Sequence, residues 1–365
     1  MDVVSVGVVA STRSGSAKTR LRGLYQGMRP TPIEGEGMTE VIDTHTHWTP
    51  SALIEVLERR EEFPRIIKQA DGSRLIEYSP GNPHPFGDEM WDERVKLAKM
   101  DAGGIDLSVI SVVGGISVVD MVDAADAVAV ARAANDELVD LCHRHPTRFA
   151  ALAALPLRTG PDAAIAELER AMSLGLKGAM VYSNVRGRML DDAEFMPVWE
   201  AAAKLGAAIQ IHPTHPLAAD WLRTDILITG IGFLFDTTTA ALRLILAGVY
   251  EKSPDLKLQL CHIGSLLPYI LGRLDYQAHM FPHEVSHLSA PPSEYARKLY
   301  TDSVCLYPPA LRLCLDVYGP DHLMWGTDDP FWPVDGAFAT LAALNLPAEE
   351  YELITAGTAR HVFGL

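Results

Sequence analysis

The sequence predicts an α/β fold, a single (β/α)8 barrel, from three observations. Eight short apolar runs alternate with longer amphipathic stretches from residue 40 onward, no break in composition divides the 365 residues, and histidine or aspartate ends several of the runs. Alternating strands and helices typically form a parallel sheet covered by helices. Functional residues of such barrels lie at the C-terminal ends of the strands. We therefore expect one TIM-type barrel over residues 38–365, with long loops forming a small cap.

The predicted strands are mostly continuous apolar runs, as expected for parallel strands that are buried on both faces. They cover residues 41–46, 105–113, 148–155, 177–182, 207–212, 257–262, 298–304 and 322–327. Each strand is followed by a stretch long enough to hold a helix, which is the arrangement that a barrel of parallel strands requires.

Amphipathic patterns predict helices over residues 120–145, 161–173, 191–204, 237–250 and 266–281. Pro161 suits the first position of a helix, where no amide hydrogen is needed. Asp191, Asp192 and Glu194 are expected near the start of the next helix, where the helix dipole favours acids.

Two segments are too long for simple connections between a strand and a helix. Residues 50–92 hold His84 and Trp91 and follow the first strand, and residues 213–235 follow the fifth. Loops of this length in a compact domain are usually functional. Because both leave strand ends, we expect them to shape a pocket on the rim of the barrel.

Charge and cysteine content narrow the class of protein. The net charge of −16 argues against nucleic acid or an anionic membrane as partner. No apolar run approaches the ~18 residues that span a bilayer. The four cysteines form no C-x-x-C pair and have mostly apolar neighbours, so we expect them reduced, in a cytoplasmic protein.

Residues 1–37 differ from the rest of the chain. They carry five basic residues among Ser, Gly and Pro, with few acids. The apolar opening has no preceding basic residue, so it makes a poor signal peptide. We expect a disordered arm, or a start assigned too early with Met38 as the true start; a targeting arm is the alternative.

The ends of four predicted strands carry residues that bind metals. His45 and His47 lie two apart, so a strand projects both side chains from one face. His212, His262 and Asp328 end the fifth, sixth and eighth strands. Each histidine alone fits a core or capping role, but their agreement at strand ends favours one divalent metal ion. Imidazoles with one carboxylate suit Zn²⁺ or Mn²⁺ rather than Ca²⁺.

Motifs spread over residues 40–365 carry a family resemblance. They are residues 41–47, 91–94, 100–106, 176–179, 184–195, 211–213, 261–265, 272–275 and 326–331. In these segments the chain resembles the decarboxylase branch of the amidohydrolase superfamily. That branch includes aminocarboxymuconate semialdehyde decarboxylase and the resorcylate-type hydroxybenzoate decarboxylases. The resemblance implies the metal-dependent hydrolase fold and a lyase.

The resemblance implies a role for each strand-end residue. His45, His47, His212 and Asp328 are the implied metal ligands, and His262 is the implied general acid/base beside the metal. The carboxylated lysine of two-metal amidohydrolases has no counterpart, apart from Lys177 near the fourth strand. One metal is therefore expected, Zn²⁺ first and Mn²⁺ second. Asp43 shares the face of the two histidines and is expected to orient a ligand, as metal-bound imidazoles usually require.

Four further residues are candidates for binding a substrate. Arg273 resembles the arginine that grips a substrate carboxylate in the neighbouring subunit, which implies a homodimer or higher oligomer. Arg94 could bind a carboxylate, with a helix salt bridge as the alternative. His215 could line the pocket or be an exposed loop residue. Trp332, like Phe331, could face an aromatic substrate.

The function that these residues predict is cofactor-free, metal-dependent decarboxylation of an aromatic or unsaturated carboxylic acid. In one sequence of steps, Asp328 or His262 delivers a proton to the carbon that loses CO₂. In another, His262 first activates a water that adds to a substrate double bond. A metal-dependent hydrolase of a lactone or amide, or a hydratase, would use the same residues. A structural metal site is the non-catalytic alternative.

Overall fold

A computed structural model describes residues 39–78 and 83–365, so our expectations for residues 1–37 lie outside the described residues. Each of the eight predicted strands is present, in shorter form at most ends. They are β1 (Ile42–Trp48), β5 (Leu107–Val112), β6 (Phe149–Ala151) continued by β7 (Ala153–Ala154), β8 (Gly178–Tyr182), β11 (Ala208–His212), β12 (Lys257–Leu260), β13 (Tyr300–Asp302) and β14 (Leu323–Met324).

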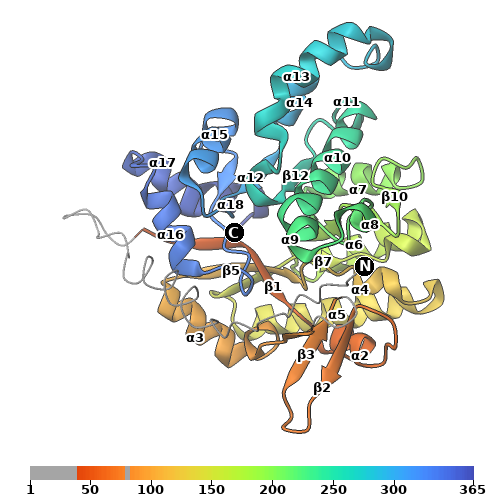
Figure 1. Cartoon of the computed structure of the whole chain (residues 1–365), viewed down its shortest axis with the longest axis vertical. Helices are drawn as coiled ribbons and strands as arrows, with labels where there is room; N and C mark the ends of the chain where they lie inside the picture. The colour runs from red at the N-terminus through yellow and green to blue at the C-terminus, as the bar shows by residue number, and fades with distance from the viewer. Residues whose placement is uncertain (1–38, 79–82) are drawn as a thin grey trace, which may run out of the picture.

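The strands form the parallel barrel that the sequence predicts. β1 pairs with β5 and β5 with β6, and the order β7-β8-β11-β12-β13-β14 continues around the barrel. Leu152 interrupts the third strand between β6 and β7, but its N–H donates to the carbonyl of Ile110 at 2.9 Å. A parallel bridge between Thr46 and Asp329 closes the barrel next to β14. Figure 1 shows helices surrounding these strands.

The helices that cover the barrel largely match the predicted ones. The longer helices are α3 (Glu93–Gly103), α5 (Ala124–Arg144), α6 (Pro161–Ser173), α7 (Met196–Leu205), α10 (Phe233–Leu246), α13 (Leu267–Met280), α15 (Pro308–Tyr318), α16 (Val334–Ala342) and α18 (Thr358–Phe363). Short helices connect them: α4 (Val118–Met121), α11 (Val249–Lys252), α12 (Cys261–Gly264), α14 (Pro292–Ala296) and α17 (Ala348–Glu352).

The prediction for the start of α7 was wrong. The helix begins at Met196, so the predicted acids precede it instead of lying in its first turn. The Asp192 carboxylate accepts the N–H of Glu194 at 3.0 Å and pairs with Arg188 at 2.9 Å. A local turn therefore uses these acids, because short carboxylates compete with the helix for backbone amides.

The first insert forms a cap. It contains α2 (Ser51–Glu58) and an antiparallel sheet of β2 (Arg65–Lys68), β3 (Arg74–Glu77) and β4 (Pro83–Pro85). Figure 1 shows β2 and β3 extending from the barrel at the opposite end from α13. The expected cap of long loops is thus partly a small sheet.

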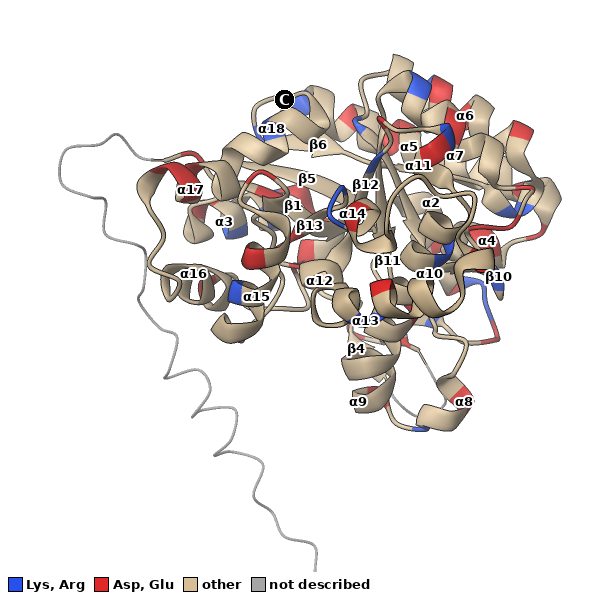
Figure 2. Cartoon of the chain, turned by 90° about the horizontal axis from the view of Figure 1, so that it is seen from above, with Lys and Arg blue, Asp and Glu red and all other residues tan. Residues whose placement is uncertain are grey.

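The second insert is more helical than predicted. It contains α8 (Ala219–Leu222), α9 (Asp225–Leu227) and a π-helical segment, Ile228–Gly232, that leads into α10. The stretch Asp225–Leu246 is long and apolar enough to cross a membrane, by length and composition only. Figure 2 shows few charged residues on α9 and α10. Ala240, Ala241 and Leu244 of α10 are buried, whereas Ile226, Ile231 and Phe235 are exposed.

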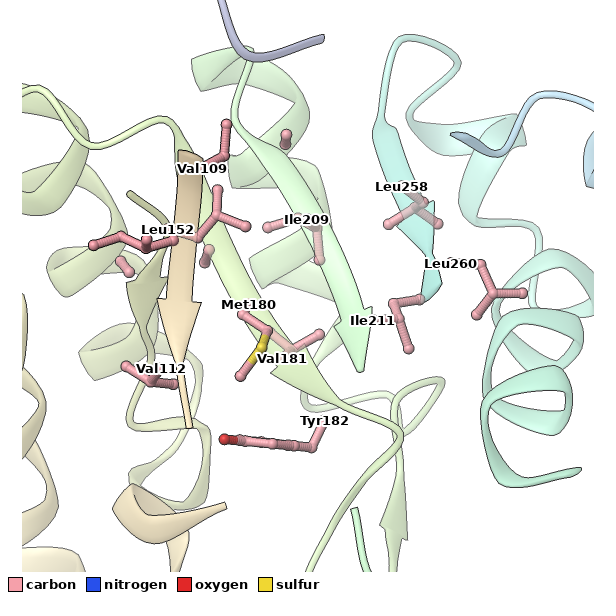
Figure 3. Close-up of a cluster of buried hydrophobic side chains, with 14 of the residues drawn as sticks. Val109, Val112, Leu152, Met180, Val181, Tyr182, Ile209, Ile211, Leu258 and Leu260 are labelled. Atoms are coloured by element: carbon pink, nitrogen blue, oxygen red, sulfur yellow. The ribbon is translucent and has the colours of Figure 1, made fainter. Parts of the chain in front are cut away.

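The core lies between the strands and the surrounding helices. Figure 3 shows Val109 of β5, Met180 of β8, Ile209 of β11 and Leu258 of β12 among its side chains. All four are at most 2% exposed. Burial of apolar surface is the main term that stabilises such a barrel, and it fixes the strand ends on which polar side chains gather.

Candidate metal centre and active site

The strand ends bring four histidines and one aspartate together. Ligand atoms of His45, His212, His262 and Asp328 all lie within 4.8 Å of one another. His47 joins the group, because its Nε2 lies 2.9 Å from Oδ1 of Asp328 and its ring centroid lies 4.8 Å from that of His212. His262 is mostly buried, and the other four residues are almost completely buried. The structure thus gathers every residue that the sequence assigned to metal binding.

Hydrogen bonds to Nδ1 orient three of the imidazoles. Nδ1 of His45 lies 2.8 Å from Oδ2 of Asp302, Nδ1 of His47 lies 2.9 Å from the carbonyl of Val112, and Nδ1 of His212 lies 2.8 Å from the carbonyl of Pro213. An oxygen acceptor at Nδ1 places the proton there and leaves a lone pair on Nε2. The N–H of Gly115 also approaches Nδ1 of His212, at 3.4 Å; the shorter contact decides the tautomer.

The free lone pairs face a carboxylate. Nε2 of His47 and of His45 lie 2.9 and 3.4 Å from Oδ1 of Asp328, and the buried Nε2 atoms of His45 and His212 have no hydrogen-bond partner among the described residues. Lone pairs that face an anion repel it unless a cation lies between them. Nitrogen and oxygen donors arranged in this way fit one divalent ion such as Zn²⁺ or Mn²⁺.

Electrostatics favour the protonation states that a metal needs in His212 and Asp328, whereas in the metal-free site Cys261, Asp302 and Asp328 outweigh burial and raise the pKa of His45. Burial and the neighbouring His47 and His45 hold the pKa of His212 well below its usual range. Burial opposes ionisation of Asp328, but the adjacent His45, His262 and His47 hold its pKa well below the usual value. A neutral imidazole and an ionised carboxylate are the forms that bind a metal.

His262 differs from the other three histidines. Its Nδ1 is buried without a partner among the described residues, and its Nε2 lies 3.3 Å from Oδ2 of Asp328. Its backbone lies in the left-handed region, at φ 60°, as does that of Asp328 at φ 55°. Such conformations are costly for residues other than glycine and concentrate at functional sites. His262 therefore has the position of an acid/base group beside the metal site.

Asp302, at the end of β13, is a site residue that the sequence interpretation missed. Besides His45, its carboxylate accepts the backbone N–H of His262 at 2.9 Å and of Val304 at 3.0 Å. Burial opposes its ionisation, but His45 lowers its pKa. A buried aspartate inside the seventh predicted run, residues 298–304, was the available signal. It orients one predicted ligand and positions the predicted acid/base group.

Asp43 has a different role from the expected one. Its carboxylate accepts the backbone N–H of His45 at 3.2 Å and the hydroxyl of Thr327 at 2.6 Å. It therefore fixes the backbone of the strands that carry His45 and Asp328 and does not touch an imidazole. Lys177 also lies away from the site, because its Nζ donates to the carbonyl of Gly364 at 3.2 Å.

Aromatic side chains approach the metal centre from three elements. The ring of Phe331 lies 5.8 Å from that of His47, and the ring of Tyr182 lies 6.2 Å from that of His212. Burial and the charge of Asp328 raise the pKa of Tyr78. Tyr78 follows β3, so the cap contributes to the surroundings of the site. The sequence interpretation missed Tyr78 and Tyr182.

The four residues assigned to substrate binding do not reach the ligands. The Arg94 side chain is 87% exposed and pairs with Asp92 at 3.2 Å, so the salt-bridge alternative describes it correctly. His215 is exposed, as in its loop alternative, and Trp332 is 38% exposed next to Phe331. Arg273 is exposed on α13, with no hydrogen bond or ion pair to another described residue.

The barrel and its rim of imidazoles define a metal-dependent enzyme of the amidohydrolase class. The chain belongs to the amidohydrolase family, whose sequence model matches residues 42–365. This match confirms the family resemblance and covers the whole barrel.

Curated relatives place the chain in the decarboxylase branch of that family. It is 30% identical over 243 residues to 2-amino-3-carboxymuconate-6-semialdehyde decarboxylase of Dictyostelium discoideum, covering 66% of this chain and 67% of the relative. It is 30% identical over 330 residues to gamma-resorcylate decarboxylase of Rhizobium radiobacter, covering 85% and 97%.

A solved structure supports the same fold and a metal. The dihydroxybenzoic acid decarboxylase of a Polaromonas species, with bound manganese and the inhibitor 2-nitroresorcinol, superimposes with a TM-score of 0.73 at 25% identity. The match covers 90% of this chain and 98% of that protein.

Proposed function

We propose that the protein is a metal-dependent, cofactor-free decarboxylase of an aromatic or unsaturated carboxylic acid. One observation carries the proposal: three buried imidazoles, each with Nδ1 bonded to a protein oxygen, direct Nε2 toward Asp328 beside a fourth histidine. The decarboxylase relatives favour this activity over lactone or amide hydrolysis, which the same residues could serve.

His45, His47, His212 and Asp328 would hold one divalent ion. When bound, the ion would neutralise negative charge that develops on a substrate oxygen near the departing carboxylate. The nitrogen-rich donor set favours Zn²⁺, whereas the manganese bound by the Polaromonas relative favours Mn²⁺. Metal analysis of the purified protein separates these two assignments.

His262 would carry the proton of the reaction. The bond between the ring carbon and the carboxylate breaks, its electron pair stays on the carbon, and a proton must replace the CO₂ that leaves. Asp328 is held ionised by its three histidine neighbours, so it is a poor proton donor. His262, whose Nε2 lies 3.3 Å from Asp328, can give its proton to that carbon and recover one from water.

The test is a panel of aromatic and unsaturated acids assayed on protein of measured metal content. We expect CO₂ release from at least one hydroxybenzoate or semialdehyde-type acid, which stops when a chelator removes the metal. Ring opening of lactones or amides without CO₂ would replace the proposal with a hydrolase. Activity that survives complete metal removal would also reject it.

We further propose a homodimer formed through α13. This helix projects from the barrel (Figure 1) and exposes Tyr269 by 82% and Tyr276 by 61%, on either side of the exposed Arg273. Large exposed apolar residues on a projecting helix are typical of an interface. Light scattering tests the assembly, and a Tyr276→Asp variant should shift the mass to that of a monomer.

Complementation tests whether Arg273 acts in the partner's site. His262→Asn and Arg273→Ala variants, each inactive alone, should regain activity after mixing if Arg273 serves the partner subunit.

We also propose a cytoplasmic location, supported by four free cysteines. Fractionation of cells that produce the full chain tests this location.

A further inference from the structure

The barrel closes at a seam that carries most of the proposed metal ligands. The N–H of Thr44 donates to the carbonyl of Trp325 at 3.0 Å, the N–H of Asp328 to that of His45 at 2.6 Å, and the N–H of His47 to that of Asp329 at 3.0 Å. β14 is only two residues long. With the N–H of Thr327, which donates to the carbonyl of His45 at 3.2 Å, four backbone hydrogen bonds hold the segment with Asp328 against the strand with His45 and His47.

A buried lysine joins the two sides of this seam. Lys96 comes from α3 and is 1% exposed. Its Nζ donates to Oδ2 of Asp329 at 2.7 Å and to the carbonyl of His47 at 3.4 Å, and it also donates to the hydroxyl of Thr46. One ammonium group thus contacts residues on both sides of the seam. Among its partners, His47 is a proposed metal ligand, and Asp329 is next in sequence to the ligand Asp328.

The chemistry of this lysine makes it an unusual choice for a core position. A buried charge is costly unless it is paired and hydrogen-bonded, and an apolar side chain would fill the space without that cost. Lys96 satisfies all three of its donors within the seam. Lys99, on the next turn of α3, pairs with the same Asp329, but its side chain is 36% exposed.

We propose that Lys96 is a positioning residue for the metal site. It holds Asp329, and with it Asp328, against the backbone of His47, and its three hydrogen bonds go to Thr46, the His47 carbonyl and Asp329, not to the donor atoms of the metal ligands. The inference rests on the metal site proposed above. Outer groups that orient ligands typically contribute about 10–100-fold to metal affinity.

Metal affinity of the apoprotein tests this role without using activity. Apoprotein is titrated with Zn²⁺ and Mn²⁺ in competition with a fluorescent chelator, for wild type, Lys96→Met, Lys96→Arg and Lys99→Met. We expect Lys96→Met to raise the metal Kd about 10–100-fold and Lys96→Arg to recover part of the loss. Lys99→Met, which removes the exposed cation beside the same carboxylate, should change Kd less than about 3-fold.

Melting temperatures distinguish positioning from simple stabilisation. If Lys96 positions the ligands, the rise in melting temperature on adding Mn²⁺ shrinks in Lys96→Met, because a bound ligand stabilises by mass action. The proposal would be overturned if Lys96→Met bound metal with the wild-type Kd and showed the wild-type rise in melting temperature. In that case its melting temperatures with and without Mn²⁺ would both be lowered by the same amount.

Two further outcomes are also decisive. If Lys96→Met does not fold, Asp329→Asn replaces it; a folded Asp329→Asn variant with raised Kd supports the proposal, and one with wild-type Kd overturns it. If wild-type apoprotein binds neither metal, the proposed function fails, which is distinct from a failure confined to Lys96.

Discussion

The carboxyl groups of Asp328 and Asp120 lie on two halves of the barrel rim, and their pKa values shift in opposite directions. Asp328 lies on the histidine half, formed by the ends of β1, β11, β12, β13 and β14, and its histidine neighbours hold its pKa well below the usual value. Asp120 follows β5 on the apolar half, formed by the ends of β5, β7 and β8. Burial raises its pKa to about 6.

The surroundings of the two carboxylates explain the difference. A cavity of about 10 Å³ borders Asp120, with Val112, Ala154 and Tyr182 among its lining residues. Asp120 accepts a hydrogen bond from Ser117, and its Oδ1 is buried without a partner among the described residues. On the histidine half, three adjacent imidazoles outweigh burial and lower the pKa of Asp328, whereas on the apolar half burial outweighs Ser117, Arg158 and Arg186 and raises the pKa of Asp120. The proposed catalytic residues therefore lie on the histidine half. The apolar half contributes the wall of the cavity and the carbonyl of Val112, which orients His47.

The strongest test of this division is replacement of the proposed proton donor. His262→Asn should lower kcat by about 10²–10⁴-fold, the usual contribution of a general acid or base. Metal content should stay near that of wild type, because His45, His47, His212 and Asp328 remain. Steady-state kinetics and metal analysis measure both quantities. His283→Asn, at a side chain that is 77% exposed, is the matched control, and wild-type turnover in His262→Asn would reject the assignment.

The next effect is that of Asp302→Asn, which removes a charged acceptor from both His45 and His262. We expect metal affinity to fall about 10–100-fold, as for other groups that orient a ligand. Chelator competition on the apoprotein measures the Kd. Asp321→Asn, at a side chain that is 68% exposed, should leave Kd unchanged. An equal Kd in Asp302→Asn and wild type would show that the hydrogen bond to His45 does not tune the site.

Burial of Asp120 predicts a pH-dependent stability. Its pKa is about 6 in the folded protein against a usual 3.8, so the folded state keeps a proton that the unfolded state loses. The contribution of Asp120 to the free energy of unfolding is fully present at low pH and declines as pH rises from about 4 to 6. In Asp120→Asn the side chain does not ionise, so the variant does not lose stability in this way.

The stability of Asp120→Asn relative to wild type should therefore increase between pH 4 and pH 7, by on the order of 2 kcal/mol. Melting temperatures of both metal-free proteins across this range measure the trend. A constant difference between them would show that Asp120 ionises normally in the folded protein.

The sequence predicted the barrel and most of the site for one physical reason. Continuous apolar runs mark strands buried on both faces, and a polar residue that ends such a run lies on the rim. His45, His47, His212, His262 and Asp328 were found in this way. Asp302 was missed because the seventh run was predicted to continue to residue 304, whereas β13 ends at Asp302 and so brings its carboxylate to the rim.

Other site residues lay beyond the reach of strand patterns. Tyr78 comes from a small cap sheet and Lys96 from α3, so their approach to the centre depends on packing between distant segments. Arg94 was a candidate because it lies in a segment that resembles the decarboxylases, with a salt bridge as the alternative. The structure shows that salt bridge, to Asp92, in the first turn of α3.

The smallest expected effect is that of Arg94→Ala. An exposed ion pair contributes about 0–1 kcal/mol, so stability should change by less than about 1 kcal/mol and KM should stay within about 2-fold of wild type, a bound set by the weakness of such pairs. Asp92→Ala is the informative companion, because Asp92 caps α3 by accepting the N–H of Arg94 at 2.9 Å. Loss of a cap costs about 1 kcal/mol, so Asp92→Ala should lower the melting temperature more than Arg94→Ala does.

A tenfold rise in the KM of Arg94→Ala at unchanged melting temperature would contradict this prediction. Arg94 would then bind substrate, and the substrate-binding residues of the rim would extend beyond the histidine half.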